Sequence, residues 1–239
     1  LYAQTLAENG FVTLAFDPSY TGESGGQPRN VASPDINTED FSAAVDFLGL
    51  QKEVDRNRIG ILGICGWGGM ALNAASMDTR VKAVATSVMY DMSRAMGHGV
   101  GDGKDRYSTS DRRAVLQYLN AQRWKDAENG TFAHSGHDIY VDENGKVTAA
   151  ERILPETLPD NPNPVLKEFF DYYRMPRGFH ARSVNSTGAW TATTPLSFMN
   201  MPLLSYAGEI TIPTLIVTGE KAHSRYFAED AFKAVGSKQ

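Results

Sequence analysis

Short apolar runs alternate with amphipathic stretches along the chain. Short runs rich in apolar residues lie at 11–16, 59–64, 81–88 and 212–217. Helical spacing of apolar residues occurs over 1–9, 38–48, 70–75 and 224–235. Apolar runs bounded by polar turn residues are typical of strands, and the Ile and Leu residues of 59–64 predict a strand buried on both faces of a parallel sheet. The alternation predicts an α/β fold with a doubly wound, mostly parallel sheet.

The pattern changes in the middle of the chain. Helical spacing covers 111–128, an Asn144-Gly145 pair between two short apolar runs predicts a hairpin over 139–148, and aromatic residues crowd a predicted helix at 165–175. We therefore divide the chain into a first part of the α/β core at 1–96, an insertion at 97–205, and the resumed core at 206–239. Asn37 or Thr38 is the expected N-cap of the second core helix.

Composition and charge narrow the classes of partner. The chain has 239 residues, of which 41% are hydrophobic and 21% charged, and a formal net charge of −5. Because no Lys/Arg cluster and no long apolar run stands out, we expect neither nucleic acid nor membrane as a partner, and a small-molecule substrate instead. The single Cys fits a reducing compartment, so we expect a cytoplasmic protein; a homo-oligomer stays open. The sequence starts at Leu1 without a Met, and we expect the natural N-terminus to lie upstream.

Candidate chemistry centres on the sequence RIGILGICGWGGM at 58–70. A strand, a Gly-rich turn and a helix follow one another here, and the side chain at the apex of such a turn projects from the edge of the sheet. Backbone N–H groups at the start of the helix point to the same place. Cys65 stands at the apex and is the candidate nucleophile. The alternative is a buried free thiol that serves only as a small hydrophobe.

This segment resembles the nucleophile elbow of the α/β-hydrolase superfamily, and within it the dienelactone-hydrolase-like branch, whose elbow carries Cys. Gly63-Ile64-Cys65-Gly66 fits the pattern Gly-x-nucleophile-x-Gly, but Trp67 stands where the final Gly belongs and Gly68 comes one residue late. Alignment from the helix side puts Gly66 or Trp67 at the nucleophile position instead. We take Cys65 as the nucleophile, with Gly66 and Trp67 as neighbouring binding residues.

The resemblance implies a hydrolase of small esters, lactones or thioesters that works through a covalent acyl-enzyme without a cofactor. The Gly66 N–H is then an oxyanion donor. The usual acid position after the strand at 212–217 holds Ala222, which leaves Asp91 or Glu220 as the triad acid. His223 is the candidate base within the sequence, and a His beyond Gln239 is expected if the chain is part of a longer protein.

The resemblance also implies roles outside the core strands. The polar loop DPSYTGESGG at 17–26 is similar to a loop that lines the site in these enzymes, so Tyr20 is a candidate binding residue, with a plain turn as the alternative. The insertion at 97–205 resembles the cap that many α/β hydrolases place over the nucleophile. His134 and His137 lie three apart without an evident third ligand, so we predict no metal site.

Two other functions stay open. The same fold could transfer the acyl group to an acceptor other than water. Trp67 in the elbow and Ala222 in the acid position also allow a catalytically silent binding protein. Fast alkylation of the thiol with a pKa well below about 8.5 would favour the enzyme, and slow alkylation independent of pH near neutrality would favour the binding protein.

Overall fold

A computed structural model of the chain describes residues 2–101, 107–136 and 138–236. The chain divides into two compact units. The first unit contains Leu1–Pro18, Pro34–Met92 and Pro202–Gln239, and the second contains Ser19–Ser33 and Ser93–Met201. Each unit is described by itself.

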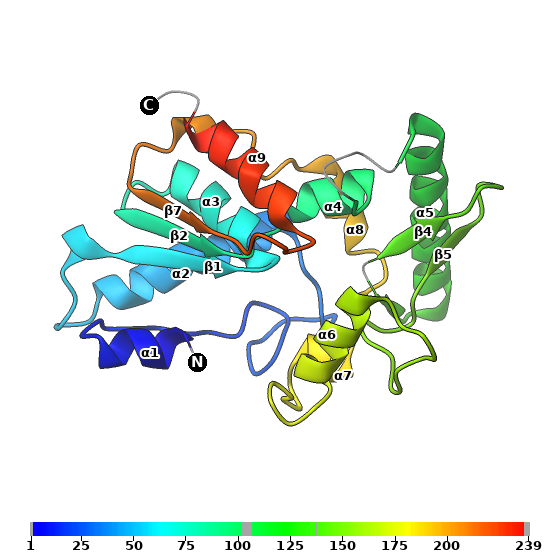
Figure 1. The fold of residues 1–239 in the computed structure, drawn as a ribbon, viewed down its shortest axis with the longest axis horizontal. Helices are drawn as coiled ribbons and strands as arrows, with labels where there is room; N and C mark the ends of the chain where they lie inside the picture. Colours follow the sequence, from blue (N-terminus) through cyan, green and yellow to red (C-terminus); the bar gives the residue numbers. More distant parts are fainter. Residues whose placement is uncertain (1, 102–106, 137, 237–239) are drawn as a thin grey trace. The chain divides into compact units, whose positions relative to one another are not determined.

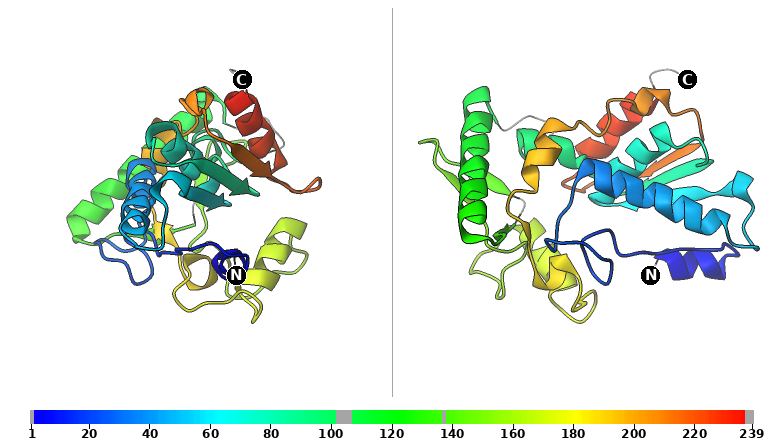
Figure 2. Two further views of the ribbon diagram at one scale, coloured as in Figure 1. Left: turned by 90° about the vertical axis from the view of Figure 1, so that its left-hand side faces the viewer. Right: turned by 180° about the vertical axis from the view of Figure 1, so that it is seen from behind.

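The first unit is a parallel sheet with flanking helices. Its elements are α1 (Tyr2–Glu8), α2 (Pro34–Gly49), η1 (Arg56–Arg58), β1 (Gly60–Ile64), α3 (Trp67–Met77), β2 (Ala83–Ser87), η2 (Ala207–Glu209), β7 (Thr214–Val217) and α9 (Arg225–Gly236). The strand order is β1-β2-β7 and both pairings are parallel, with Ile64 opposite Ser87 and Ser87 opposite Val217. Figures 1 and 2 show α3 and α9 on one side of this sheet and α1 on the other. The predicted parallel sheet with helices is confirmed.

The core of this unit follows from the composition of α3. Its residues are small or apolar, so six of them are buried: Gly68, Gly69, Met70, Ala71, Leu72 and Ala74. The helix packs against β1 and β2, and α2 packs against α3 in turn. At the other end of the strands Val45, Ile59 and Val81 form a buried cluster, so that α2 closes over the starts of β1 and β2.

The prediction of a strand at 11–16 is wrong. The segment is extended, but among the described residues it pairs with no other strand. A strand is stable only when a neighbour satisfies its backbone N–H and C=O groups, which the apolar run by itself does not provide. The side chains of Phe11 and Val12 are 62% and 53% exposed, whereas Phe16 packs edge-on against Phe41 of α2 with ring centroids 6.1 Å apart.

Two further expectations need correction. Strand β1, predicted to be buried on both faces, is not: Gly60 is exposed, and Gly63 alone of its five residues is buried. The second core helix begins at Pro34 and not at Thr38. Proline suits the first helical turn since its fixed φ is already helical, and Asn37 and Thr38 therefore lie buried inside α2.

The second unit combines helices with two small antiparallel pairs. Its elements are α4 (Met92–His98), which begins at the unit boundary, α5 (Thr109–Asn129), β3 (His134–Ser135), β4 (Ile139–Val141), β5 (Val147–Ala149), α6 (Pro164–Tyr173), α7 (Val184–Thr187), β6 (Trp190–Thr191) and α8 (Pro195–Asn200). The predicted hairpin is present as β4 and β5. Gly145 takes the positive φ of +77° that its turn requires, and Oδ1 of Asp142 accepts hydrogen bonds from the N–H groups of Asn144 and Lys146. None of the helices traced in the described ranges has the length and apolar character of a membrane span.

Candidate active site

The chain turns from β1 into α3 at Cys65, whose φ is +55°. Gly66 has an ordinary right-handed helical conformation, with φ −57°, and Trp67 is the first residue of α3. The residue in the left-handed region is therefore Cys65. A side chain in this region costs conformational energy and is typical of a nucleophile elbow, where strain directs the reactive group out of the turn. Of the three registers left open by the sequence, this geometry favours the one with Cys65 at the apex.

Gly68 takes the place of the glycine that the elbow pattern expects at Trp67. A Cβ atom added to Gly63 would lie 2.5 Å from the Trp67 carbonyl oxygen and 2.8 Å from Cα of Gly68. A Cβ atom on Gly68 would lie 2.3 Å from Cβ of Met89. Strand and helix thus approach one another at Gly63 and Gly68, and only glycine fits at either position. The Trp67 side chain points elsewhere, which explains how the elbow tolerates it.

The apex is also held to the next strand by its backbone. The N–H of Cys65 donates to the carbonyl of Ser87 at 3.0 Å, and the carbonyl of Cys65 accepts from the N–H of Gly68 at 3.0 Å and of Tyr90 at 2.8 Å. These bonds tie the elbow to the end of β2, so the position of Cys65 depends on both strands.

Burial raises the pKa of the Cys65 thiol above its ordinary value, since a thiolate loses solvation in the partly buried elbow. The backbone N–H of Gly66 donates toward the sulfur and lowers the pKa, a smaller effect. The role of this N–H as an oxyanion donor stays a prediction; in the resting structure it contacts the thiol. At neutral pH the resting Cys65 is therefore a neutral thiol, and a nucleophilic attack by it needs a base.

The raised pKa of the Cys65 thiol predicts how its alkylation depends on pH. Because the folded protein disfavours the thiolate, the rate of Cys65 alkylation by iodoacetamide should rise with pH through a midpoint above the ordinary thiol value of about 8.5. The same titration in concentrated urea, where Cys65 is solvated, should return to the ordinary midpoint and serves as the control. A midpoint well below 8 in the folded protein would contradict the assignment and indicate a preformed thiolate.

The ends of the neighbouring strands bring a tyrosine and a histidine together. Tyr90 follows β2, and its hydroxyl forms a hydrogen bond with Nε2 of His223, which lies in the turn after β7. The Tyr90 ring also packs against Phe227 of α9, with centroids 5.0 Å apart. At this strand end the sequence pointed to Asp91 and gave no reason to select Tyr90. No local signal marks Tyr90, because its partner is distant in the sequence.

Asp91 lies next to Tyr90 and is buried. A Cβ atom on Gly69 would lie 3.4 Å from Cα of Asp91, so this residue passes close to the first turn of α3. The structure thus places Asp91 near the elbow helix, and its role as the triad acid stays a prediction, as does that of Glu220.

The Trp67 side chain packs against α2 within the first unit. Its ring meets Phe41 of α2 with centroids 6.0 Å apart, and Phe41 in turn meets Phe16. The three rings form a row from the end of the extended segment to the elbow. The predicted contact of Trp67 with substrate is not tested by this arrangement, which gives the ring a packing role.

Tyr20 lies in the second unit, at a φ of +69°. Its ring covers Gly26, where an added Cβ atom would lie 2.5 Å from the ring. The guanidinium of Arg29 donates to the carbonyls of Gly22 at 2.8 Å and Ser24 at 2.5 Å, which fixes the shape of this loop. The binding role of Tyr20 stays a prediction.

Comparison with known proteins assigns the family. The model of the dienelactone hydrolase family matches residues 2–90, a range that contains the elbow and Tyr90. The protein YcjY of Escherichia coli K12 is 32% identical over 237 residues, which cover 99% of this chain and 70% of YcjY. The chain belongs to the dienelactone hydrolase family. The predicted family is confirmed.

Two other relatives match different shares of this chain. PA2218 of Pseudomonas aeruginosa is 58% identical over 235 residues, or 98% of this chain, which spans 58% of the length of PA2218. Thiohydrolase aneE of Aspergillus aculeatus is 39% identical over 82 residues, which cover 34% of this chain and 26% of that protein.

Solved structures agree on the fold of this family member. The crystal structure of PA2218 superposes with a TM-score of 0.86 over 98% of this chain and 67% of that chain. The α/β hydrolase GrgF from Penicillium, 19% identical, superposes with a TM-score of 0.70 over 98% of this chain and 70% of GrgF. The second likeness concerns the fold alone. The predicted α/β-hydrolase fold is confirmed.

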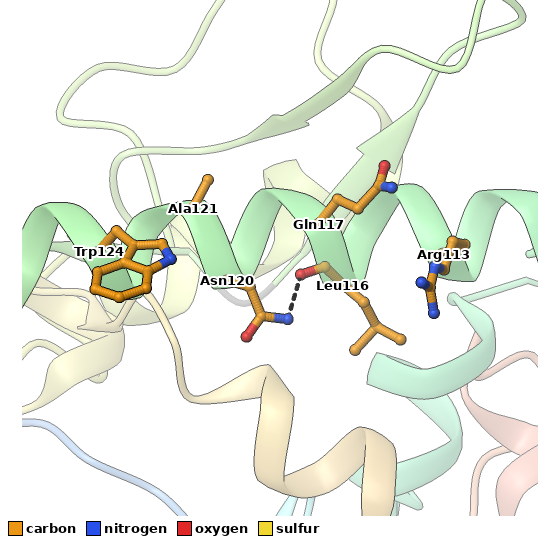
Figure 3. A pocket seen from close by; sticks show the side chains of 6 residues that line it. All are labelled: Arg113, Leu116, Gln117, Asn120, Ala121 and Trp124. Atoms are coloured by element: carbon orange, nitrogen blue, oxygen red, sulfur yellow. Dashed lines mark hydrogen bonds between the residues drawn. The ribbon is translucent and has the colours of Figure 1, made fainter.

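The two histidines of the second unit that lie three apart were considered as metal ligands. His137 lies outside the described residues, and Nε2 of His134 lies 3.2 Å from the carbonyl of Arg29. The described residues contain no group of three or more His, Cys, Asp or Glu side chains placed to hold a metal. An open hollow of about 430 Å³ lies along α5, lined by Arg113, Leu116, Gln117, Asn120, Ala121 and Trp124 (Figure 3). This lining holds one cation, two amides and three apolar side chains, and no nucleophile or base.

Proposed function

We propose that the protein hydrolyses small ester, lactone or thioester substrates through a covalent acyl-enzyme on Cys65. The observation that carries the proposal is the position of Cys65 at the apex of the elbow, with a φ of +55° and with Gly63 and Gly68 closing the turn beneath it. Membership of the dienelactone hydrolase family supports hydrolysis, and the similarity of part of the chain to a protein named thiohydrolase supports thioesters among the substrates.

Because burial raises the pKa of the Cys65 thiol, we propose a reaction that starts from the neutral thiol and needs a base. A base takes the thiol proton while the sulfur attacks the carbonyl carbon, and the carbonyl oxygen becomes an oxyanion that the Gly66 N–H can stabilise. The carbon–oxygen or carbon–sulfur bond then breaks, and the leaving alcohol or thiol takes the proton from the base. Water attacks the acyl-enzyme with the help of the same base, which releases the carboxylic acid and restores the thiol.

We assign the role of base to His223 and that of the acid that orients it to Asp91. Both follow strands of the same parallel sheet as Cys65, and ligands of such sheets bind at the carboxyl ends of the strands. The close contacts at Gly68 support the enzyme over the silent binding protein, because Gly68 takes the place of the glycine that the elbow pattern has at Trp67. Ala222 at the usual acid position remains a reason for the binding protein.

The test is direct detection of the acyl-enzyme. The protein is mixed with a panel of short-chain p-nitrophenyl esters and thioesters, quenched in acid, and analysed by intact-mass spectrometry and peptide mapping. We expect one acyl group on the peptide that contains Cys65, and no acylation of Cys65→Ala. Turnover without an acyl group on Cys65 would contradict the proposed nucleophile. Absence of both turnover and acylation with every substrate would favour the binding protein.

A further inference from the structure

The turn after β2 is fastened to the elbow by backbone hydrogen bonds. The N–H of Cys65 donates to the carbonyl of Ser87 at 3.0 Å, and the N–H of Tyr90 donates to the carbonyl of Cys65 at 2.8 Å. The N–H of Gly69 then donates to the carbonyl of Tyr90 at 3.1 Å. The three bonds alternate between the two segments, so the segments lie side by side in a fixed register. The residues that follow Tyr90 therefore have a defined position against the first turn of α3.

Met92 is the residue after this turn whose side chain reaches the elbow. It is the first residue of α4, belongs to the first unit and is 9% exposed. A Cβ atom placed on Gly66 would lie 3.3 Å from Sδ of Met92 and 3.4 Å from its Cγ. Gly66 itself has an ordinary helical φ of −57°, so its backbone conformation does not require glycine. The lack of a side chain at Gly66 instead leaves room that the Met92 thioether fills.

Gly66 is also the residue that contacts the Cys65 thiol. Its backbone N–H donates toward the sulfur, while its Cα faces the Met92 side chain. The reactive thiol and the Met92 thioether thus border the same residue. A thioether is apolar and flexible, and its sulfur is only a weak acceptor, so it does not compete with an oxyanion for the Gly66 N–H.

We propose that Met92 is a specificity-determining residue that limits the length of the acyl chain on Cys65, and that the site takes short, straight-chain acyl groups. The inference rests on the proposed function, in which Cys65 carries the acyl group and the Gly66 N–H binds its carbonyl oxygen. The acyl chain is attached to the same carbonyl carbon, so it extends beside Gly66 and meets Met92 there. A chain longer than this space allows must displace a buried side chain.

Three variants separate the length of the side chain at this position from a general loosening of the fold. Met92→Ala removes the three atoms beyond Cβ and opens the space beside Gly66, whereas Met92→Leu keeps the volume. Met96→Ala is the matched control, because Met96 lies on the same helix, is 7% exposed, and has no atom within 4 Å of the Cβ position at Gly66. The melting temperature of each variant is measured first. If Met92→Ala has no cooperative melting transition, Met92→Val replaces it and is held to the same direction of change.

The first measurement uses the thiol alone, without turnover. Methyl, butyl and hexyl methanethiosulfonate each transfer an alkylthio group to Cys65: the Cys65 sulfur forms a disulfide bond, the sulfur–sulfur bond of the reagent breaks, methanesulfinate leaves, and the thiol proton goes to solvent. Rate constants at pH 9 are followed by intact-mass spectrometry and divided by those in concentrated urea, which cancels the intrinsic reactivity of each reagent. Cys65 is the only cysteine of the sequence, so one site is observed.

We expect the hexyl-to-methyl ratio of these corrected rates to rise roughly tenfold or more in Met92→Ala, since one excess methylene in a closed pocket costs about that factor. Met92→Leu and Met96→Ala should stay within about twofold of wild type, because neither opens space beside Gly66. An unchanged ratio in Met92→Ala, or an equal rise in Met96→Ala, would overturn the inference.

The second measurement is kcat/KM for p-nitrophenyl acetate, butanoate and hexanoate, which share one leaving group. The hexanoate-to-acetate ratio should rise roughly tenfold in Met92→Ala and not in Met96→Ala. A rise that follows the size of the leaving group in a series of acetates, and not the acyl chain, would contradict the assignment. The two measurements fail separately: a shifted thiosulfonate pattern without any turnover would refute the proposed function and leave Met92 as the wall beside the thiol. Turnover with an unchanged chain-length ratio would refute the role of Met92 and leave the proposed function standing.

Discussion

Cys65→Ala is expected to lower kcat/KM for esters and thioesters by roughly 10³-fold or more, since it removes the atom that forms the acyl bond. Cys65 is the only cysteine of the sequence, and its φ of +55° directs the side chain out of the elbow. Cys65→Ser should retain more activity than Cys65→Ala if a base takes the proton, because a neutral thiol and a hydroxyl need the same assistance. Because the pKa of the Cys65 thiol is raised, the activities of Cys65→Ser and Cys65→Ala compare two neutral nucleophile positions, with and without an attacking atom.

The control for this experiment is Ser76→Ala on the same helix. The Ser76 hydroxyl donates to the carbonyl of Asn73 at 2.7 Å, and Ser76 lies at the far end of α3 from the elbow, so kcat/KM should stay within about twofold of wild type. The measurement is initial-rate kinetics of purified variants at equal concentration. Activity of Cys65→Ala close to that of wild type would exclude Cys65 as the nucleophile and return the elbow to a structural role.

Gly63→Ala is expected to destabilise the first unit by about 3 kcal/mol, at the upper end of the cost of overpacking. The added Cβ atom would lie 2.5 Å from the Trp67 carbonyl oxygen and 2.6 Å from Cβ of Ala71, and neither atom belongs to a flexible side-chain end. Strand β1 and helix α3 would have to separate. For a chain of this length the expected fall in melting temperature is about 6 to 12 °C.

Gly219→Ala is the matched control for this substitution. A Cβ atom on Gly219 would lie 3.6 Å from Cβ of Ala222, an ordinary contact, although Gly219 also follows a strand of the same sheet. Differential scanning calorimetry of both variants measures the difference. Equal melting temperatures would show that strand and helix can yield at Gly63, and would remove the close approach as the reason for glycine in the elbow.

Local features of the chain were predictable from the residues. The turn at Cys65, the hairpin at Asn144 and Gly145, and the helix that begins after Asn163 depend on backbone conformations and caps that adjacent residues decide. The Cys65 register was open because two nearby glycines follow the apex. The structure favours one register through a contact between Gly63 and Gly68, which are close in sequence but lie on a strand and a helix.

Features that depend on distant partners were not predictable. The apolar run at 11–16 has the composition of a strand, but a strand exists only where another strand pairs with it. Burial of the sheet faces depends likewise on which helices cover them. Tyr90 had no distinguishing neighbour in the sequence, and its contact with His223 joins residues 133 positions apart.

The sequence by itself therefore determined the order of elements, the elbow and the family, because turns, caps and hydrophobic periodicity act over a few residues. Only the tertiary structure decided that Trp67 packs against Phe41, that burial keeps the thiol of Cys65 neutral, and that Tyr90 meets His223 at the sheet edge. These properties arise from strand order and from the exclusion of water, and both exist only after distant segments have come together.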